Sequence, residues 1–356
     1  MDTAKPHTIK KFELIEKYVE TWAQKLLNYR ECSGIVFIDC MCNSGVYKDI
    51  SDNPVYGTPI RVSKYLSEIM KNYPAKNAWV CFNDLSADKI TTLKTHLPSD
   101  TANFHIITND GDGNDFLASE KIPRSPNLNY LLVYDPYEAS IDWNALTPYI
   151  NAWGEVILNH MHSDSVRGVS QLKSDTALAK YENTYLTSIK NLVDCDRNEY
   201  EQRVQKIISS LHQSQYKPYY IASFPFFNRK NAVVYNLLHC SSNIKGFRLY
   251  KSTVWQIFGG KSSTKNRHGN ENQLMLDFES TGESRTAIDE DCYNVNDIVT
   301  YVQDRFKGQS DVPLSEIWNA LDEHPIFPTD GFKDDIKSGL KNNGNKVSRS
   351  TITFAR

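Results

Sequence analysis

Three short apolar runs in the first half of the chain decide its fold, and each ends in an acidic residue: GIVFID (34–39), WVCFND (79–84) and LLVYD (131–135). Continuous apolar runs of this length are typical of strands that are buried on both faces of a parallel sheet. Ligands of such sheets bind outside the carboxyl ends of the strands. We therefore expect Asp39, Asp84 and Asp135 to converge on one crevice at a single edge of the sheet.

Further runs extend this pattern along the chain. We predict strands at 104–108 and 155–159, and then a hairpin whose strands, 219–224 and 232–238, flank a turn-rich stretch. Five strands that alternate with helices, followed by an antiparallel pair, predict an α/β, Rossmann-like domain. The count matches the seven-stranded sheet of methyltransferases that use S-adenosylmethionine (SAM) better than a six-stranded dinucleotide-binding domain.

The composition along the chain predicts two domains. Residues 1–258 form the Rossmann-like domain, with a polar helical insertion at about 165–215. Residues 259–290 are polar and contain Gly, Ser, Thr and Asn, which is typical of a linker. Residues 291–356 contain three short helical segments and a β-like stretch at 346–354, a pattern that predicts a winged-helix domain.

The bulk composition indicates a globular, cytoplasmic protein. Of the 356 residues, 40% are hydrophobic, and no apolar run approaches the length of a bilayer-spanning helix. The charged N-terminus lacks the apolar core of a signal peptide. The seven cysteines include no CxxC motif, so we predict reduced thiols. Cys40 and Cys42 are expected to be turn or core residues rather than metal ligands, and we expect no metal site.

The turn after the first strand is the candidate site for the methionine part of SAM. We assign Asp39, Cys40, Asn43 and Gly45 to it, because small or flexible residues let a ligand approach the backbone. Asp39 would bond the methionine amine. The turn has no GxGxxG motif, which argues against NAD or FAD.

The ends of the next two strands supply candidates for the adenosine part. Asp84 stands where an acid bonds the two ribose hydroxyls, and one such bond contributes about 1.5–3 kcal/mol. Asn83 is the alternative ribose contact, and helix capping is the alternative role of Asp84. Asp112 or Asp115 would bond the adenine amine, although a plain turn fits the same residues. A calcium loop is excluded because its twelfth position is Lys121 instead of Glu.

Asp135-Pro136-Tyr137, directly after the fourth strand, is the candidate reactive centre. Methyltransferases that act on base amines have (Asp/Asn)-Pro-Pro-(Tyr/Phe) at this place. The acid and a backbone carbonyl accept hydrogen bonds from the amine, and the aromatic ring stacks on the extruded base. This chain has one proline instead of two, and Asp-Pro also begins ordinary turns. His160 and His162, after the fifth strand, are expected to have polar, non-catalytic roles.

The charge is unevenly distributed. The net charge is −3, yet residues 202–270 contain eleven Lys and Arg and no Asp or Glu. Such a stretch indicates a polyanionic partner, nucleic acid first, although it could instead fold against the acidic half of the chain. The candidate contacts to nucleic acid are basic residues of this stretch and of the predicted winged helix: Arg229, Lys230, Lys245, Arg248, Lys251, Lys333, Lys337 and Lys341.

With these motifs in place, the chain resembles the three-Cys-motif partner (TcmP) family over most of its length. The matching residues are Lys17, Tyr18, Asp39 to Gly45, Gly57-Thr58-Pro59, Asp135-Pro136-Tyr137, Trp143, Tyr235 to His239, Gly246, Phe247, Tyr250 and Lys251. The resemblance implies a methyltransferase-like Rossmann domain, a C-terminal winged helix, and a partner protein that bears three cysteines. The first turn departs from the family pattern, because Cys40, Cys42 and Ser44 replace residues of the Gly, Ala or Pro type.

Two functions follow from the sequence. The first is a SAM-dependent methyltransferase that acts on nucleic acid at a base amine, together with a three-cysteine partner protein. The alternative is a catalytically inactive Rossmann-like binding module, whose winged helix binds DNA or the partner.

Overall fold

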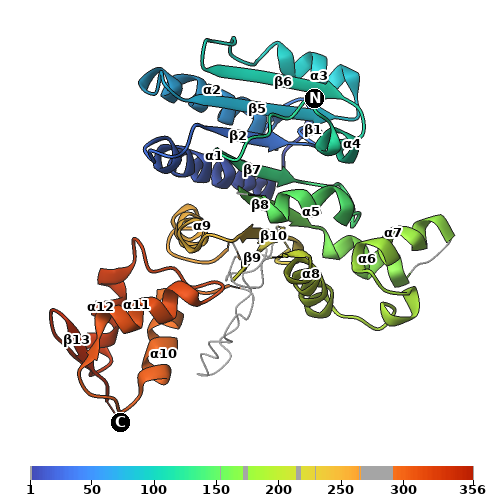
Figure 1. The fold of residues 1–356 in the computed structure, drawn as a ribbon. Coiled ribbons are helices and arrows are strands. Elements are labelled where there is room, and N and C mark those ends of the chain that lie inside the picture. Colours follow the sequence, from blue (N-terminus) through green and yellow to red (C-terminus); the bar gives the residue numbers. More distant parts are fainter. Residues whose placement is uncertain are drawn as a thin grey trace.

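The computed structural model describes residues 2–152, 154–170, 175–213, 218–228, 230–263, 265 and 292–355. Arg229 and most of the predicted linker at 259–290 lie outside the described residues. Within the described part of the chain, seven strands form one large sheet, and a smaller helical unit lies at the C-terminal end (Figure 1).

The strands of the large sheet lie in the order β6-β5-β2-β7-β8-β10-β9. They are β2 (Gly34–Asp39), β5 (Asn77–Asp84), β6 (Phe104–Asp110), β7 (Leu128–Tyr134), β8 (Gly154–His160), β9 (Tyr220–Phe227) and β10 (Val233–Ser241). The first five strands in the chain run parallel, whereas β10 is antiparallel to both of its neighbours. The predicted α/β sheet, five alternating strands followed by an antiparallel pair, is therefore confirmed.

Helices cover both faces of this sheet. Its central strands, such as β2 and β7, are therefore buried along their whole length. One face packs against α1 (Pro6–Leu27), α2 (Thr58–Ile69), α3 (Ala87–Lys94) and α9 (Ile244–Ile257). The other packs against α4 (Gly113–Ala118), α5 (Trp143–Asn151) and α8 (Arg197–Leu211). The apolar side chains of α1 recur every three or four residues, so that one stripe of the helix faces the sheet.

The segment between β8 and β9 contains α6 (His162–Ser170), α7 (Asp175–Tyr185), a short 3-10 helix, η2 (Ile189–Asn191), and α8. A second 3-10 helix, η1 (Met70–Asn72), follows α2. In Figure 1 the α6–α8 segment lies beside the β9–β10 end of the sheet. It occupies the stretch for which we predicted a helical insertion.

A small three-stranded sheet lies next to the turn after β2. Its order is β1-β3-β4, with β1 (Asp2–Thr3), β3 (Val46–Lys48) and β4 (Pro54–Tyr56). The first residues of the chain therefore pair with a segment that begins directly after Gly45. This small sheet was not predicted, because strands of two or three residues leave no periodic pattern in a sequence.

The C-terminal unit, residues 292–355, consists of three helices and three very short strands. In chain order these are α10 (Val295–Phe306), β11 (Val312–Pro313), α11 (Leu314–Glu323), α12 (Lys333–Asn342), β12 (Lys346–Val347) and β13 (Thr351–Thr353). The strands pair in the order β11-β13-β12. The single β-like stretch that we expected at 346–354 thus consists of two short antiparallel strands, β12 and β13, joined by a turn.

This unit docks on α9 through a buried cation. The Nζ atom of Lys251 donates hydrogen bonds to the carbonyl oxygens of Leu321 (3.0 Å), Asp322 (3.0 Å) and His324 (2.5 Å) at the end of α11. Lys251 is fully buried, so our expectation that it contacts nucleic acid was wrong. Beside it, Arg248 pairs with the Asp322 carboxylate at 3.0 Å.

No helix among the described residues combines the length and apolarity that a membrane span requires.

Candidate active site

The three strand-end carboxylates lie at one rim of the large sheet. Asp39 and Asp84 are the last residues of β2 and β5, and Asp135 directly follows β7. Burial, and then the negative charge of Asp135, raise the pKa of Asp39 to about 7. Asp84 adds to this shift, so each of the other two acids is close enough to affect the charge of Asp39.

Asp135 is held by two donors from distant parts of the chain. Lys11 of α1 forms an ion pair with its Oδ2 atom, and the Nδ2 atom of Asn159, on β8, donates to its Oδ1 atom. The side chain of Asp135 remains 25% exposed, whereas that of Lys11 is 9% exposed. The Oδ1 atom of Asn159 is buried and has no hydrogen-bond partner among the described residues. A carboxylate and a free carbonyl acceptor therefore stand side by side.

Asp84 organises the turn after β2. Its Oδ2 atom accepts the backbone N–H of Asn43 at 2.9 Å, and its Oδ1 atom accepts the backbone N–H of Ser86 at 3.0 Å. Asn43 has a left-handed backbone with φ 58°, and so does Gly45 with φ 68°. These conformations bend the chain sharply, and the hydrogen bond that the Asn43 backbone donates to Asp84 fixes the bend. The helix-capping role that we weighed for Asp84 falls instead to Ser86, the N-cap of α3, whose side chain accepts the backbone N–H of Lys89.

The Asn43 side chain connects the turn to two other segments. Its Nδ2 atom donates to the hydroxyl of Tyr137 at 2.7 Å and to the carboxylate of Asp2 at 3.0 Å. The cofactor candidate Asn43 and the reactive-centre candidate Tyr137 are therefore in direct contact. Tyr137 is nevertheless 68% exposed, so most of its ring faces solvent.

The other residues of the turn are buried. Cys40 and Cys42 are at most 4% exposed, and burial raises the pKa of both thiols. Asn83, which we weighed as a ribose contact, donates from Nδ2 to the carbonyl oxygens of Cys40 and Gly111, both at 3.0 Å. It ties the loop after β6 to the turn after β2. Asn83 is therefore part of the scaffold of the rim.

The two candidates for the adenine contact are exposed residues at the start of α4. Asp112 is the N-cap, and its Oδ1 atom accepts the backbone N–H groups of Asn114 at 2.8 Å and Asp115 at 3.2 Å. Asp115 lies in the first turn of the helix. The capping bonds account for the position of Asp112 by themselves, and an adenine contact stays a prediction.

Sequence reasoning missed four residues at this rim. Lys11 and Asn159 hold Asp135, and Lys89 lies 3.5 Å from the Tyr137 hydroxyl and 4.0 Å from Asp84. Leu85, directly after Asp84, is 79% exposed, which is unusual for leucine. Lys89 also lines a pocket of about 320 Å³, whose walls come from β1, the turn after β2, β3 and α3: Asp2, Asn43, Ser44, Val46, Asp88, Lys89 and Thr92. An apolar residue directly after a strand-end acid was the available signal for Leu85.

The basic candidates differ in their surroundings. Lys230, Lys245, Lys333 and Lys341 are exposed. Lys333 and Lys337 each place Nζ 5.9 Å from the centre of the Trp318 ring. Arg248 and Lys251 instead hold the C-terminal unit. For Lys251 the expected phosphate contact is replaced by a structural role, because the side chain is fully buried against carbonyl oxygens. Arg248 pairs with Asp322 but its side chain is 33% exposed, so a phosphate contact of Arg248 stays a prediction.

Comparisons with known proteins leave the family open. No family model matches the chain, and no curated protein matches it. The resemblance to the TcmP family therefore stays a prediction. Among the residues that the structure describes, no group of three or more His, Cys, Asp or Glu is placed to hold a metal ion.

Several solved structures share features of the fold. A Legionella pneumophila protein of family DUF519 has TM-score 0.40 and 11% identity, over 72% of this chain and 93% of that one. Loganic acid methyltransferase with SAH has TM-score 0.32 and 8% identity, over 71% and 81%. Human methyltransferase-like protein 13 in complex with SAH has TM-score 0.31 and 10% identity, over 76% and 99%. At these values the methyltransferase-like fold rests on the strand order of the sheet rather than on the matches.

Proposed function

We propose that this chain is a SAM-dependent methyltransferase whose acceptor is an amine of a nucleic-acid base. The observation that carries the proposal is the arrangement at Asp135. Its carboxylate is partly exposed and fixed by Lys11 and Asn159, and the buried Oδ1 atom of Asn159 has no partner in the described structure. A buried acceptor without a donor is costly, so it points to a donor supplied by a ligand.

The residues at the rim fit SAM. Asp84 would offer a carboxylate to the ribose, and the exposed Leu85 would offer an apolar surface to the adenine. The pocket of about 320 Å³ is lined by Asn43 of the turn after β2 and by Lys89 of α3. Asp39 would bond the methionine amine. When bound, SAM supplies an electrophilic methyl group. The buried thiols of Cys40 and Cys42 leave the backbone of the turn as the approach to the methionine part.

Asp135 and Asn159 would then orient the acceptor. An amine –NH₂ group has two hydrogens, and two oxygens, one from each residue, can accept them. Both hydrogen bonds together fix the direction of the nitrogen lone pair, and orientation of this kind is a large part of catalysis in group transfer. Lys11 forms an ion pair with Asp135 and so holds its carboxylate in place. The exposed ring of Tyr137 is available to stack on the base.

The C-terminal unit supports nucleic acid as the substrate class. Its element order, helix–strand–helix–helix–strand–strand, with the strands paired β11-β13-β12, is consistent with a winged helix. Lys333, Lys337 and Lys341 lie on its third helix, α12, and the first two flank Trp318. We further propose that this unit contacts the nucleic acid or the three-cysteine partner protein that the TcmP resemblance implies.

A second candidate function, the inactive binding module, is favoured by Asn43. Its side chain bridges Asp2 and Tyr137 and so closes the space between the cofactor turn and the reactive centre. In this case Asp39, Asp84 and Asp135 would only stabilise the rim.

SAM binding and methyl transfer separate the two candidates. SAM at about 100 times its Kd should stabilise the protein by about 2.7 kcal/mol, which raises its thermal midpoint. Transfer of labelled methyl from SAM to single-stranded or duplex DNA and RNA tests the reaction. Asp135→Ala should abolish transfer and keep the SAM-induced rise, whereas Glu120→Ala, a change of an exposed acid outside the proposed site, should change neither. No rise at saturating SAM would favour the binding module.

A further inference from the structure

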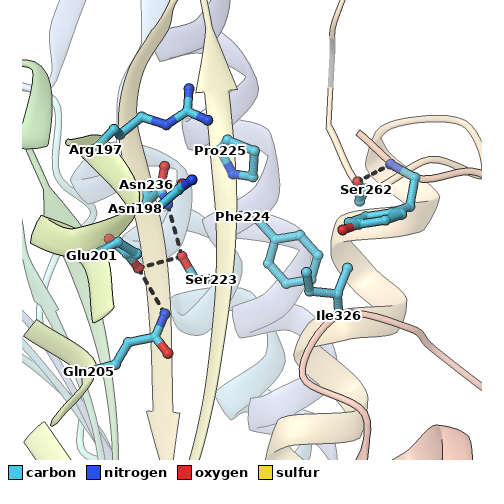
Figure 2. A pocket seen from close by; sticks show the side chains of 11 residues that line it. Arg197, Asn198, Glu201, Gln205, Ser223, Phe224, Pro225, Asn236, Ser262 and Ile326 are labelled. Carbon is cyan, nitrogen blue, oxygen red and sulfur yellow. Dashed lines mark hydrogen bonds between the residues drawn. The ribbon is translucent and has the colours of Figure 1, made fainter. Parts of the chain in front are cut away.

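A second pocket, away from the proposed SAM site, lies between α8 and the β9–β10 hairpin (Figure 2). Its volume is about 180 Å³. Arg197, Asn198 and Gln205 line it from α8, and Pro225 and Asn236 line it from the hairpin. Figure 2 shows Arg197 reaching from α8 toward Pro225. Ser262, together with Tyr293 and Ile326 of the C-terminal unit, closes the remaining side.

The floor of the pocket is a fixed carboxylate. Glu201 accepts hydrogen bonds from His160 Nδ1 (2.6 Å), Ser223 Oγ (2.6 Å) and Gln205 Nε2 (3.2 Å). Although burial opposes the charge, these bonds, with His160 the strongest contributor, lower the pKa of Glu201 to about 2. Glu201 therefore stays ionised at any physiological pH.

Asn236 is fixed as well. It donates from Nδ2 to Ser223 Oγ at 3.1 Å, and its Oδ1 atom lies 3.1 Å from His162 Nε2. Burial and the neighbouring His160 lower the pKa of His162 to about 4, so this ring is neutral at pH 7. Both histidines thus orient polar groups of the pocket.

The pocket lies at the same rim as Asp135 but on the opposite face of the sheet, since Asp135 contacts Lys11 of α1 whereas His160 contacts Glu201 of α8. Asp135 follows β7, and in the ladder His160 at the end of β8 pairs with Asn236, which pairs with Pro225 on β9. Neighbouring strands are about 4.8 Å apart, so β10 and β9, which carry the pocket wall, lie about 10–14 Å from β7. Three or four nucleotides at about 3.4 Å each cover the distance between these strands, and a single strand must cross the rim to reach both faces.

The chemistry of the lining selects a base over a phosphate. An ionised carboxylate repels a phosphate, whereas it accepts hydrogen bonds from an exocyclic amine, as Glu and Asp do from the amine of cytosine. The side-chain amides of Asn198 and Gln205 add both donors and acceptors. The guanidinium plane of Arg197 and the ring of Tyr293, which also lines the pocket, are surfaces on which unpaired bases stack.

We propose that this pocket binds an unpaired nucleobase with an exocyclic amine, on the same strand as the base that Asp135 holds. This inference rests on the proposed function, because it takes the substrate of that site to be a single strand with more than one ordered nucleotide. The nucleic-acid strand crosses the rim, with one base at Asp135 and Tyr137 on one face of the sheet and a flanking base over Glu201 on the other.

Binding of homopolymers by the full-length protein tests the proposal. Fluorescence anisotropy compares dC12 with dT12, and rC12 with rU12, because each pair differs at an amine that becomes a carbonyl oxygen. We expect the cytosine strands to bind about tenfold more tightly or better. Asn198→Ala with Gln205→Ala should reduce that preference about five- to tenfold, since one hydrogen bond contributes about 1 kcal/mol. Gln202→Ala, on the exposed face of α8, is the matched control and should leave the preference unchanged.

The outcomes are distinct for the two proposals. Equal binding of dC12 and dT12, or an equal loss for both strands in the double variant, would overturn the base pocket. Free cytidine that competes as well as dC12 would overturn the assignment to a strand and leave a nucleoside site. Pocket variants that lose the cytosine preference but keep the SAM-induced rise in thermal midpoint would show that the loss comes from the base pocket and not from the cofactor site. A wild-type protein that prefers dC12 yet binds no SAM would refute the proposed function alone.

Discussion

At the scale of single residues, the central feature is the Lys11–Asp135 ion pair. It joins the first helix to the end of the fourth strand of the sheet and supplies the positive charge nearest to two acids. Removing one partner of a largely buried pair leaves the other charge uncompensated, which is the costly part of such a change. The pair therefore links the stability of the rim to the charge of the proposed reactive centre.

We predict that Lys11→Met lowers the free energy of unfolding by about 1–3 kcal/mol, because Asp135 then stands unpaired beside Asp39. Urea unfolding at pH 7 measures the change. Lys10→Met is the control, since Lys10 forms a surface pair with Glu13 and should cost at most about 0.5 kcal/mol. Adding Asp135→Asn to Lys11→Met should recover part of the loss. Additive losses in the double variant would show that the two residues do not interact.

The raised pKa of Asp39 predicts how the stability of the protein depends on pH. Its pKa in the folded protein is about 7, well above the value of about 3.9 in an unfolded chain. Between these values the folded state binds more protons than the unfolded state, so stability falls as the pH rises from about 4 to about 7. Asp39→Asn removes this titration, and the variant should lose less stability than the wild type between pH 5 and pH 8. The difference should be about 2–4 kcal/mol in urea unfolding.

Asp115→Asn is the matched control for this experiment, because Asp115 is exposed at the start of α4. It should leave the pH dependence of the wild type unchanged. If Asp39→Asn shows the same slope as the wild type, Asp39 is ionised in the folded protein throughout the range, and its burial beside Asp135 does not govern the charge of the rim.

At the scale of elements, α9 and α11 are joined by one side chain. Lys251 projects from α9 and donates to three carbonyl oxygens at the end of α11, where the helix leaves its last carbonyl groups without internal partners. The cation also interacts favourably with the negative end of the helix dipole. Burial lowers the pKa of Lys251 to about 7, which reflects how completely this contact is shielded from water.

We predict that Lys251→Met destabilises the protein by about 2–4 kcal/mol, because buried carbonyl oxygens lose their donors. Lys245→Met, an exposed change on the same helix, should have an effect within about 0.5 kcal/mol. Limited proteolysis adds a structural measurement: the C-terminal unit, residues 292–355, should become more sensitive to cleavage in Lys251→Met alone. Unchanged stability and unchanged cleavage would mean that the apolar contacts between the units hold the C-terminal unit in place without Lys251.

At the scale of the whole molecule, the distribution of positive charge predicts how the protein binds a polyanion. Of the described basic candidates, Lys333, Lys337 and Lys341 lie together on α12, whereas Arg248 and Lys251 are used inside the protein. Affinity for duplex DNA falls with salt in proportion to the number of phosphates that are neutralised, with a slope of about 0.9 per contact.

Replacing Lys333, Lys337 and Lys341 together by Gln should therefore reduce the slope of log Kd against log salt by about 2–3 on duplex DNA. Anisotropy measured over a range of salt concentrations gives the slope. The control is the double variant Lys71→Gln with Lys94→Gln, which changes two exposed positions on the first domain. It should leave the slope unchanged. An unaltered slope in the triple variant would exclude α12 as the surface that contacts DNA.

Much of the sheet could be predicted from the sequence, and the candidate site only in part. Buried strands leave continuous apolar runs, so β2, β5 and β7 were identified with Asp39, Asp84 and Asp135 at or just past their carboxyl ends. Lys11 was missed because a lysine on an amphipathic helix looks like a solvated residue until the helix is placed over a sheet. Asn159 was missed because one amide at a strand end leaves no motif.

The sequence by itself determined the order of strands and helices, and hence that three acids would stand at one edge of a parallel sheet. That information is local, since each run of apolar residues and each strand end is contiguous in the chain. Only the tertiary structure decided what those acids do: Asp135 meets Lys11 from 124 positions away, and Asp84 holds the backbone of Asn43. It likewise turned Lys251 inward and placed Glu201 under a pocket, because the partner of a charged side chain is chosen by the segments that pack against it, wherever they lie in the chain.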